Sequence, residues 1–89
     1  MLFMSVSTYK PEKRDENIKR RAEKGTMFTG GKILGEWVVI GGGTIFRLFE
    51  ADNPMDMEKS SLAWSDLGKS TIMPVMPLED VMKLAVSKK

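Results

Sequence analysis

The sequence predicts an α+β domain in which a four-stranded antiparallel sheet carries two helices on one face. Segments of alternating hydrophobicity and segments of helical composition follow one another in the order β-α-β-β-α-β, with one further helix at the end. This is the order of the ferredoxin-like arrangement, whose sheet order is 4-1-3-2. Pro74 lies within the last strand segment, and a residue without a backbone N–H fits only an edge strand. The sheet order independently puts that strand at an edge, so the two observations agree on one domain over residues 1–89.

The first two elements are a strand over residues 2–9 and a helix over residues 12–24. Apolar and polar residues alternate through the strand segment, which is typical of a half-buried strand. The helical segment is rich in Glu, Lys and Arg and ends before Gly25, a residue suited to a helix C-terminus. Its apolar stripe is thin, essentially Ile18 and Ala22 one turn apart. We therefore expect this helix to cover one side of a sheet and not to be stable alone.

A β-hairpin is predicted from residues 33–40 and 44–51, which are rich in β-branched and aromatic residues and flank Gly41–Gly43. A phosphate-binding loop is the alternative for three glycines, but such a loop opens a helix, and here a strand follows. With a two-residue turn at the last two glycines, Trp37 lies opposite Leu48. One face then holds Trp37, Val39, Phe46, Leu48 and Glu50, and the other holds Glu36, Val38, Ile40, Ile45, Arg47 and Phe49. A three-residue loop would change this facing, so the register stays open.

A second helix is predicted to begin at Asn53, which is suited to cap it, with Pro54 at the first helical position. We expect this helix to run to Leu67 and to stop at Gly68. Its inner face is predicted to consist of Met57, Ser61, Trp64 and Leu67. A short edge strand over residues 70–75 follows. The spacing i, i+3, i+4, i+7 of Leu78, Val81, Met82 and Ala85 predicts a terminal amphipathic helix.

The sequence contains no Cys and no His, and these two absences limit its chemistry. They exclude disulfides, zinc sites of the Cys/His kind, thiolate nucleophiles, Ser-His-Asp triads and His-ligated haem. A chain of this length buries only roughly 60–65% of its unfolded surface, so its stability as a monomer is marginal. The sheet face without helices would expose a wide apolar surface. We therefore expect a homodimer or a larger assembly in which two sheets pack face to face.

The net charge of +2 comes mainly from the first helical segment. Residues 10–24 carry seven basic and four acidic residues, and the rest of the chain carries seven basic and eight acidic residues. This stretch has no aromatic residues to stack bases, so we interpret it as a solvated helix and do not expect nucleic acid as a partner. The sequence shows no targeting signal and no apolar run of about 20 residues. We therefore expect a cytoplasmic protein that does not bind the membrane.

Several short motifs resemble a known family. They are Met1-Leu2-Phe3-Met4 with Tyr9-Lys10-Pro11, Phe46-Arg47-Leu48-Phe49-Glu50-Ala51-Asp52-Asn53-Pro54, Leu62-Ala63-Trp64-Ser65-Asp66-Leu67 and Ile72-Met73-Pro74-Val75. Over nearly the whole chain, they resemble a short bacterial and archaeal family of domains of unknown function in the dimeric α+β barrel superfamily. The resemblance implies a ferredoxin-like protomer and a homodimer whose sheets form a barrel, but no established activity. Related superfamilies include cofactor-free monooxygenases, haem-degrading enzymes and ligand-sensing domains, and the haem-binding branches commonly use a His that this sequence lacks.

Trp37 and Glu50 share a face of the predicted hairpin and are candidates for a small-molecule site. An aromatic ring and a carboxyl group inside an apolar cavity would suit such a site. Burial there would favour the protonated carboxyl group and acid–base work, so Glu50 is the candidate catalytic residue. The alternative is structural: Trp37 packs in the core or in a dimer interface, and Glu50 pairs with a Lys or Arg at the strand end.

Tyr9, Arg47 and Trp64 are the other ligand-binding candidates, because each combines a large side chain with a polar tip. Arg47 interrupts an apolar strand, and it would either orient an anionic ligand or pair with Glu36, a near-diagonal neighbour in the expected register. Trp64 is expected to pack beneath the second helix. No metal or cofactor is predicted, since the acidic residues near Asp52 are explained by capping and helix-dipole effects. The eight Met residues suit adaptable packing.

Three functions are compatible with these residues. The first is a small homodimeric domain that binds or senses a small apolar or aromatic molecule in a pocket between sheet and helices. The second is a cofactor-independent, monooxygenase-like enzyme in which Glu50 acts on the substrate. The third is a structural or interaction module that uses the basic first helix. A ligand-dependent gain in melting temperature would favour the first, and oxygen uptake that is lost in Glu50→Gln would favour the second.

Overall fold

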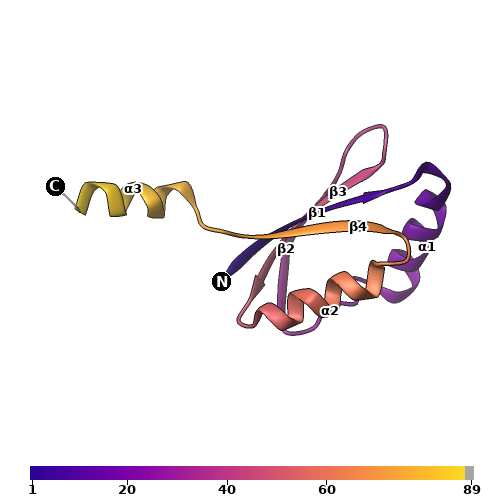
Figure 1. Cartoon of the computed structure of the whole chain (residues 1–89), viewed down its shortest axis with the longest axis horizontal. Helices are drawn as coiled ribbons and strands as arrows, with labels where there is room; N and C mark the ends of the chain where they lie inside the picture. The colour runs from indigo at the N-terminus through magenta and orange to yellow at the C-terminus, as the bar shows by residue number, and fades with distance from the viewer. Residues whose placement is uncertain (88–89) are drawn as a thin grey trace.

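The four strands pair antiparallel in the order β2-β3-β1-β4, and α1 and α2 lie along the same sheet (Figure 1). The computed structural model describes residues 1–87. Its elements are β1 (Leu2–Tyr9), the short 3₁₀ helix η1 (Pro11–Lys13), α1 (Arg14–Lys24), β2 (Gly31–Val38), β3 (Thr44–Ala51), α2 (Pro54–Trp64), β4 (Gly68–Val75) and α3 (Leu78–Ser87). Read from the other edge, the sheet order is 4-1-3-2. The predicted ferredoxin-like fold is confirmed, with Pro74 in an edge strand.

Alternation along the strands gives the sheet a helix-covered face and an open face. On β3, Ile45, Arg47 and Phe49 are buried on the covered face, whereas Phe46 and Leu48 are half-buried on the open face. This division of the β3 residues is the one predicted from the sequence. Arg47 is thus a charged residue in the middle of an otherwise apolar buried row.

The apolar core lies between α2 and the sheet. Its buried members are Phe3, Phe49, Ala51 and Met57, and the half-buried Phe28, Ile33 and Ile72 pack against them. The rings of Phe28 and Phe49 meet edge to face with centroids 4.9 Å apart, a favoured aromatic geometry. The predicted inner face of the second helix is confirmed at Met57 and Trp64, but the buried serine is Ser60 and not Ser61. Leu67 is also buried, although it lies beyond the end of the helix.

The β2–β3 hairpin has a longer loop than the expected two-residue turn. Val39 N donates to Thr44 O at 3.0 Å, so four residues form the loop, and Gly41–Gly43 all adopt positive φ between 88° and 102°. Trp37 therefore lies opposite Phe46, not Leu48. The register differs by two residues, which keeps every side chain on its expected face. β2 correspondingly begins and ends two residues earlier than expected, and a bulge lies at Leu34.

α2 begins as predicted and ends earlier. Asn53 Oδ1 accepts a hydrogen bond from Met55 N at 2.9 Å, which caps the helix. The helix was expected to run to Leu67, but it ends at Trp64. Ser65 N and Ser65 Oγ both donate to Leu62 O, at 3.3 and 3.0 Å, and this tightens the last turn into a 3₁₀ turn.

α1 covers one side of the sheet as predicted (Figure 1), but the thin apolar stripe of Ile18 and Ala22 does not pack against the domain. Ile18 is 60% exposed and Ala22 is also exposed, while the buried residue of α1 is the polar Asn17. Arginines hold the helix instead. Arg20 donates to the Ala63 carbonyl oxygen at 3.1 Å and to both Asp66 carboxylate oxygens at 2.7 Å, which joins α1 to the end of α2.

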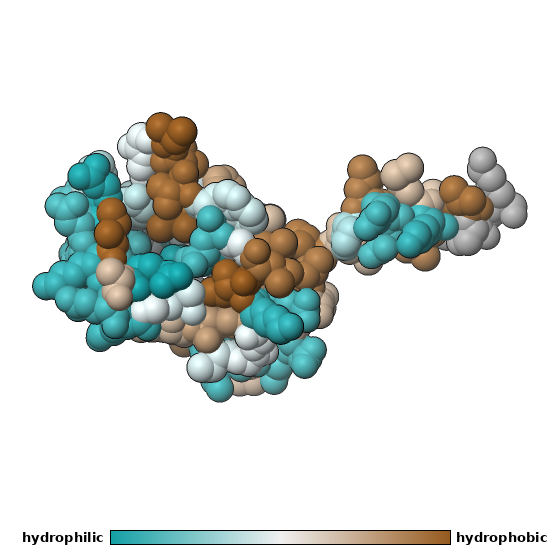
Figure 2. Space-filling view, turned by 180° about the vertical axis from the view of Figure 1, so that it is seen from behind, coloured by the Kyte–Doolittle hydropathy of each residue, from teal (hydrophilic) through white to brown (hydrophobic). Residues whose placement is uncertain are grey.

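α3 extends away from the sheet beyond the end of β4 (Figure 1). The side chains of residues 78–86 are exposed, including the predicted stripe of Leu78, Val81, Met82 and Ala85. Apolar surface also covers the end of the body from which α3 leaves and the tip of the β2–β3 hairpin (Figure 2). No helix within residues 1–87 is both long enough and apolar enough to cross a membrane.

Candidate functional site

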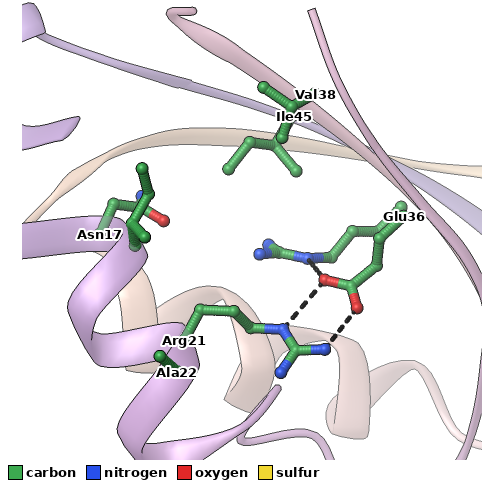
Figure 3. Close-up of a pocket in the computed structure, with 8 residues that line it drawn as sticks. Asn17, Arg21, Ala22, Glu36, Val38 and Ile45 are labelled. Carbon is green, nitrogen blue, oxygen red and sulfur yellow. Dashed lines mark hydrogen bonds and ion pairs between the residues drawn. The ribbon is translucent and has the colours of Figure 1, made fainter. Parts of the chain in front are cut away.

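A cavity of about 300 Å³ lies between α1 and the β2–β3 hairpin. It is lined by Asn17, Ile18, Arg21 and Ala22 of α1, by Glu36 and Val38 of β2, and by Ile45 and Arg47 of β3. Figure 3 shows the α1 residues facing the strand residues across this space. The cavity exists because long arginine side chains, and not close apolar contacts, join α1 to the rest of the domain. Its walls are mainly apolar, and its charged groups gather on one side.

Glu36 joins two arginines in an ion triad beside the cavity. Arg21 donates from Nε and Nη2 to the two carboxylate oxygens, at 3.2 and 2.6 Å, and Arg47 Nε donates to Glu36 Oε2 at 2.9 Å (Figure 3). The fork of Arg21 matches the carboxylate geometry. With two positive charges and one negative charge, the triad keeps a net charge of +1 at the cavity.

The triad fixes the charge state of Glu36. Hydrogen bonds from Arg21, and secondarily from Arg47, lower the pKa of Glu36 from its ordinary value of 4.5 to about 2, against the opposing effect of burial. The same bond raises the pKa of Arg21 above its ordinary value. Glu36 and Arg21 are therefore both charged at neutral pH, and Glu36 acts as a permanent acceptor, not as a proton donor.

Arg47 is held in place by Glu36 and Trp64, and these contacts leave its two terminal nitrogens free of hydrogen bonds to the described residues. Its side chain is only 8% exposed, and its guanidinium lies 5.2 Å from the ring centroid of Trp64, a cation–π contact. Trp64 is itself fixed by a bond from Nε1 to Thr26 O at 3.3 Å. Among the described residues, only Nε of Arg47 has an acceptor. Every fully buried side-chain polar atom of the described residues has a partner, so the two terminal nitrogens keep some solvent exposure, and Arg47 is one of the residues that line the cavity.

Asn17 is the second polar group directed at the cavity. The residue is 8% exposed, and its amide faces the cavity from α1 (Figure 3). No other described residue provides a hydrogen-bond partner for this side chain. Its amide atoms keep some contact with solvent, so water pairs with them in the free protein, and a polar group of a bound molecule can replace that water.

The structure divides the residues that the sequence suggested for one site. Arg47 and Trp64 lie together on the covered face, whereas Trp37 and Glu50 are exposed on the open face. Trp37 pairs with Phe46, four residues from Glu50, which is about 13 Å along a strand. Tyr9 lies at the end of β1. The five candidates therefore do not form one site, and the burial required for acid–base work by Glu50 is absent from this chain on its own.

Two shallower hollows contain the remaining candidates. Tyr9 lines a hollow of about 480 Å³ beside the hairpin loop, which shares Ile18 and Val38 with the cavity. Glu50 lines another, of about 420 Å³, at the end of the sheet near Met76. Within residues 1–87, no group of three acidic side chains is arranged to hold a metal ion.

Sequence reasoning missed Asn17 and Arg21 as cavity residues. One signal in the sequence relates them: Asn17 and Arg21 are four residues apart, so their side chains lie on the same face of α1. The charge of residues 10–24 predicts a solvated helix, and that interpretation does not single out either residue. The cation–π contact joins Arg47 of β3 to Trp64 of α2. These residues are 17 positions apart in the sequence, and no local sequence pattern predicts a contact at that separation.

No curated protein and no solved structure matches this chain. The family model described as "Domain of unknown function (DUF3303)" matches residues 1–89, which agrees with the expected short family of domains of unknown function, and the chain belongs to the DUF3303 family.

Proposed function

We propose that this protein is a small homodimeric binding domain that takes up a small apolar or aromatic molecule in the cavity between α1 and the β2–β3 hairpin. The observation that carries the proposal is the cavity itself, about 300 Å³ of space walled by Ile18, Ala22, Val38 and Ile45. Ligand pockets occupy roughly 300–1,000 Å³ and combine apolar walls with a few fixed polar groups. A volume at the low end suits a molecule with a single ring.

The way α1 is attached supports uptake of a ligand. Arg20 and Arg21 tether the helix at its sides, to Asp66 and Glu36, while its apolar residue Ile18 stays largely exposed beside the cavity. A small apolar molecule would cover Ile18 and the facing Ile45 without displacing an existing core contact. Burial of apolar surface at about 25 cal/mol per Å² would favour such binding.

The homodimer is proposed from the open face of the sheet. Trp37 is 53% exposed there and Met73 is 41% exposed, beside the half-buried Phe46 and Leu48. An apolar face of this width marks an interaction surface. A second copy is the proposed partner because an 89-residue chain gains much of its missing burial by pairing identical sheets.

α3 gives the dimer a second apolar surface. Val81 is 44% exposed and Met82 is 58% exposed, on a helix that projects beyond the sheet (Figure 1). A helix with an apolar stripe is stable when that stripe is covered. We propose that the second copy covers this stripe, so that α3 of each protomer packs against the other protomer.

The binding proposal is tested with toluene as the probe and methyl NMR as the readout. Toluene should shift the methyl resonances of Ile18, Ala22, Val38 and Ile45 and leave those of α3 unchanged. Ala22→Leu places a larger side chain in the cavity and should abolish the shifts while keeping α1 helical. Lys83→Leu introduces the same side chain at an exposed position of α3 off the apolar stripe and is the control. Toluene shifts that survive in Ala22→Leu, or that spread over the open face, would contradict the proposed site.

The two other functions have less support. Monooxygenase-like chemistry depends on Glu50, which lies on the sheet face opposite the cavity, and oxygen uptake with a quinol substrate in wild type and Glu50→Gln tests it. The interaction module depends on free basic groups of α1, yet Arg20 and Arg21 are already paired with acids. Salt-dependent binding to nucleic acid or to an acidic protein would support the interaction module.

A further inference from the structure

We infer that the ligand of this cavity carries a carboxylate, which the two terminal nitrogens of Arg47 bind as a fork; this inference rests on the proposed function. It concerns the chemical class of the ligand. The apolar walls account for uptake of a small molecule, and three observations about charge and hydrogen bonding add the carboxylate.

The first observation is the position of the Arg47 guanidinium. Its Nε is occupied by Glu36 at 2.9 Å and its ring-facing surface by Trp64 at 5.2 Å, so the group cannot swing to another partner. The terminal nitrogens have no acceptor in the described chain and are not fully buried, and Arg47 lines the cavity. A fixed guanidinium with two parallel N–H donors matches the two oxygens of a carboxylate.

The second observation is the charge balance. Arg21 and Arg47 share a single carboxylate, that of Glu36, which leaves one positive charge uncompensated beside the cavity. The Arg47 side chain is only 8% exposed, whereas that of Arg21 is 40% exposed, so a monoanionic ligand beside Arg47 would place the balancing charge where solvent screens least. The third observation is the unpaired amide of Asn17, which can donate to a carboxylate oxygen from the α1 side.

The experiment compares two probes of the same shape, phenylacetate and phenylacetamide, by isothermal titration calorimetry and methyl NMR at pH 7. Each has one ring and a short side chain, which suits the cavity volume. The inference predicts that phenylacetate binds at least tenfold more tightly than phenylacetamide. Equal affinities for the two probes would overturn the inference and leave the proposed function standing. If neither probe binds at the cavity, the proposed function itself fails.

Arg47→Met tests the role of Arg47 directly. Met has a similar length and keeps a contact with the Trp64 ring, and Glu36 retains its two bonds from Arg21, so the variant should fold. The affinity for phenylacetate should fall to that for phenylacetamide, while the affinity for the amide stays within about twofold. Lys19→Met removes one positive charge from exposed α1 and should leave the preference for phenylacetate intact. A preference that persists in Arg47→Met, with a folded-state NMR spectrum, would contradict the assigned role.

Discussion

Arg47 and Glu36 lie directly opposite each other in the β2–β3 hairpin, with Arg47 Nε 2.9 Å from Glu36 Oε2. In the register of a two-residue turn they would be diagonal neighbours. The four-residue loop moves β2 by two positions and brings the charges face to face on the covered side of the sheet. This pair, extended by Arg21, holds α1 above the sheet and leaves one guanidinium directed at the cavity. The cavity and its charge therefore have the same structural cause.

The charge of Glu36 predicts how stability depends on pH. Because its pKa is lowered from 4.5 to about 2 in the folded state, the Glu36 bonds stabilise the fold fully above about pH 5, and this contribution is lost as the pH falls towards 2. The full shift corresponds to at most about 3 kcal/mol, and solvent screening at this partly exposed group reduces the expected contribution to about 1 kcal/mol. Urea unfolding at pH 6, 4 and 3 measures it.

Glu36→Gln is the variant for this experiment. It should be less stable than wild type at pH 6, since Arg47 loses its counterion, and its stability should decline less steeply between pH 5 and pH 3. An unchanged slope would show that other carboxyl groups cause the acid sensitivity. Asp66, whose pKa Arg20 lowers to about 2, is the group to test next.

The bridge from Arg20 to the end of α2 predicts the local stability of α1. Arg20→Met removes the bonds to Ala63 and Asp66, so α1 should open more often while the sheet stays closed. Amide hydrogen exchange should become faster over residues 14–24 and stay unchanged in β1. Arg14→Met is the control, at an exposed position that forms an ion pair with its neighbour Asp15 at 3.5 Å. Equal acceleration in both variants would mean that helix propensity, not the bridge, limits opening.

The open face predicts the effect of a charge at its centre. Phe46→Lys places an ammonium group between Trp37 and Val6, its neighbours on β2 and β1, and should dissociate the proposed dimer. Native mass spectrometry and sedimentation velocity measure the change. Met55→Lys introduces the same charge at a position on α2 that is 66% exposed and should leave the mass unchanged. A monomeric mass for the wild-type protein in these measurements would contradict the proposed dimer.

The stripe on α3 predicts a separate contribution to assembly. Met82→Gln replaces an exposed apolar side chain on that stripe and should weaken dimerisation several-fold without changing the spectrum of the sheet. Lys83→Gln changes the adjacent position off the stripe and should have no effect on the dimer. If the two variants behave alike, α3 does not contact the second copy.

Most of the fold could be predicted because its signals are local. Alternation defined β1 and β3 at the observed residues, and Asn53 with Pro54 marked the start of α2. The sheet order followed from the element order and from Pro74. The misplaced boundaries lie where hydrogen bonds compete over a few residues, as at Ser65, whose side chain shortens α2.

The site could be predicted only in part. Arg47 stood out because it interrupts an apolar strand, and its pairing with Glu36 is confirmed. The roles of Asn17 and Arg21 depend on how far α1 stands from the sheet, which is a tertiary property. Ile18 and Ala22 form a thin apolar stripe, which suggests a packing surface. In the structure this stripe is too small to pack α1 closely against the sheet, and a cavity remains beneath the helix.

Binding of a small carboxylate in this cavity is tested most directly by intermolecular nuclear Overhauser effects between phenylacetate and the methyl-labelled protein. Phenylacetate bound in the cavity should give cross-peaks from its ring protons to Ile18, Val38 and Ile45, together with a shift of the Arg47 side-chain resonances. Cross-peaks to Met73 or Leu48 on the open face, or none at saturating phenylacetate, would contradict it.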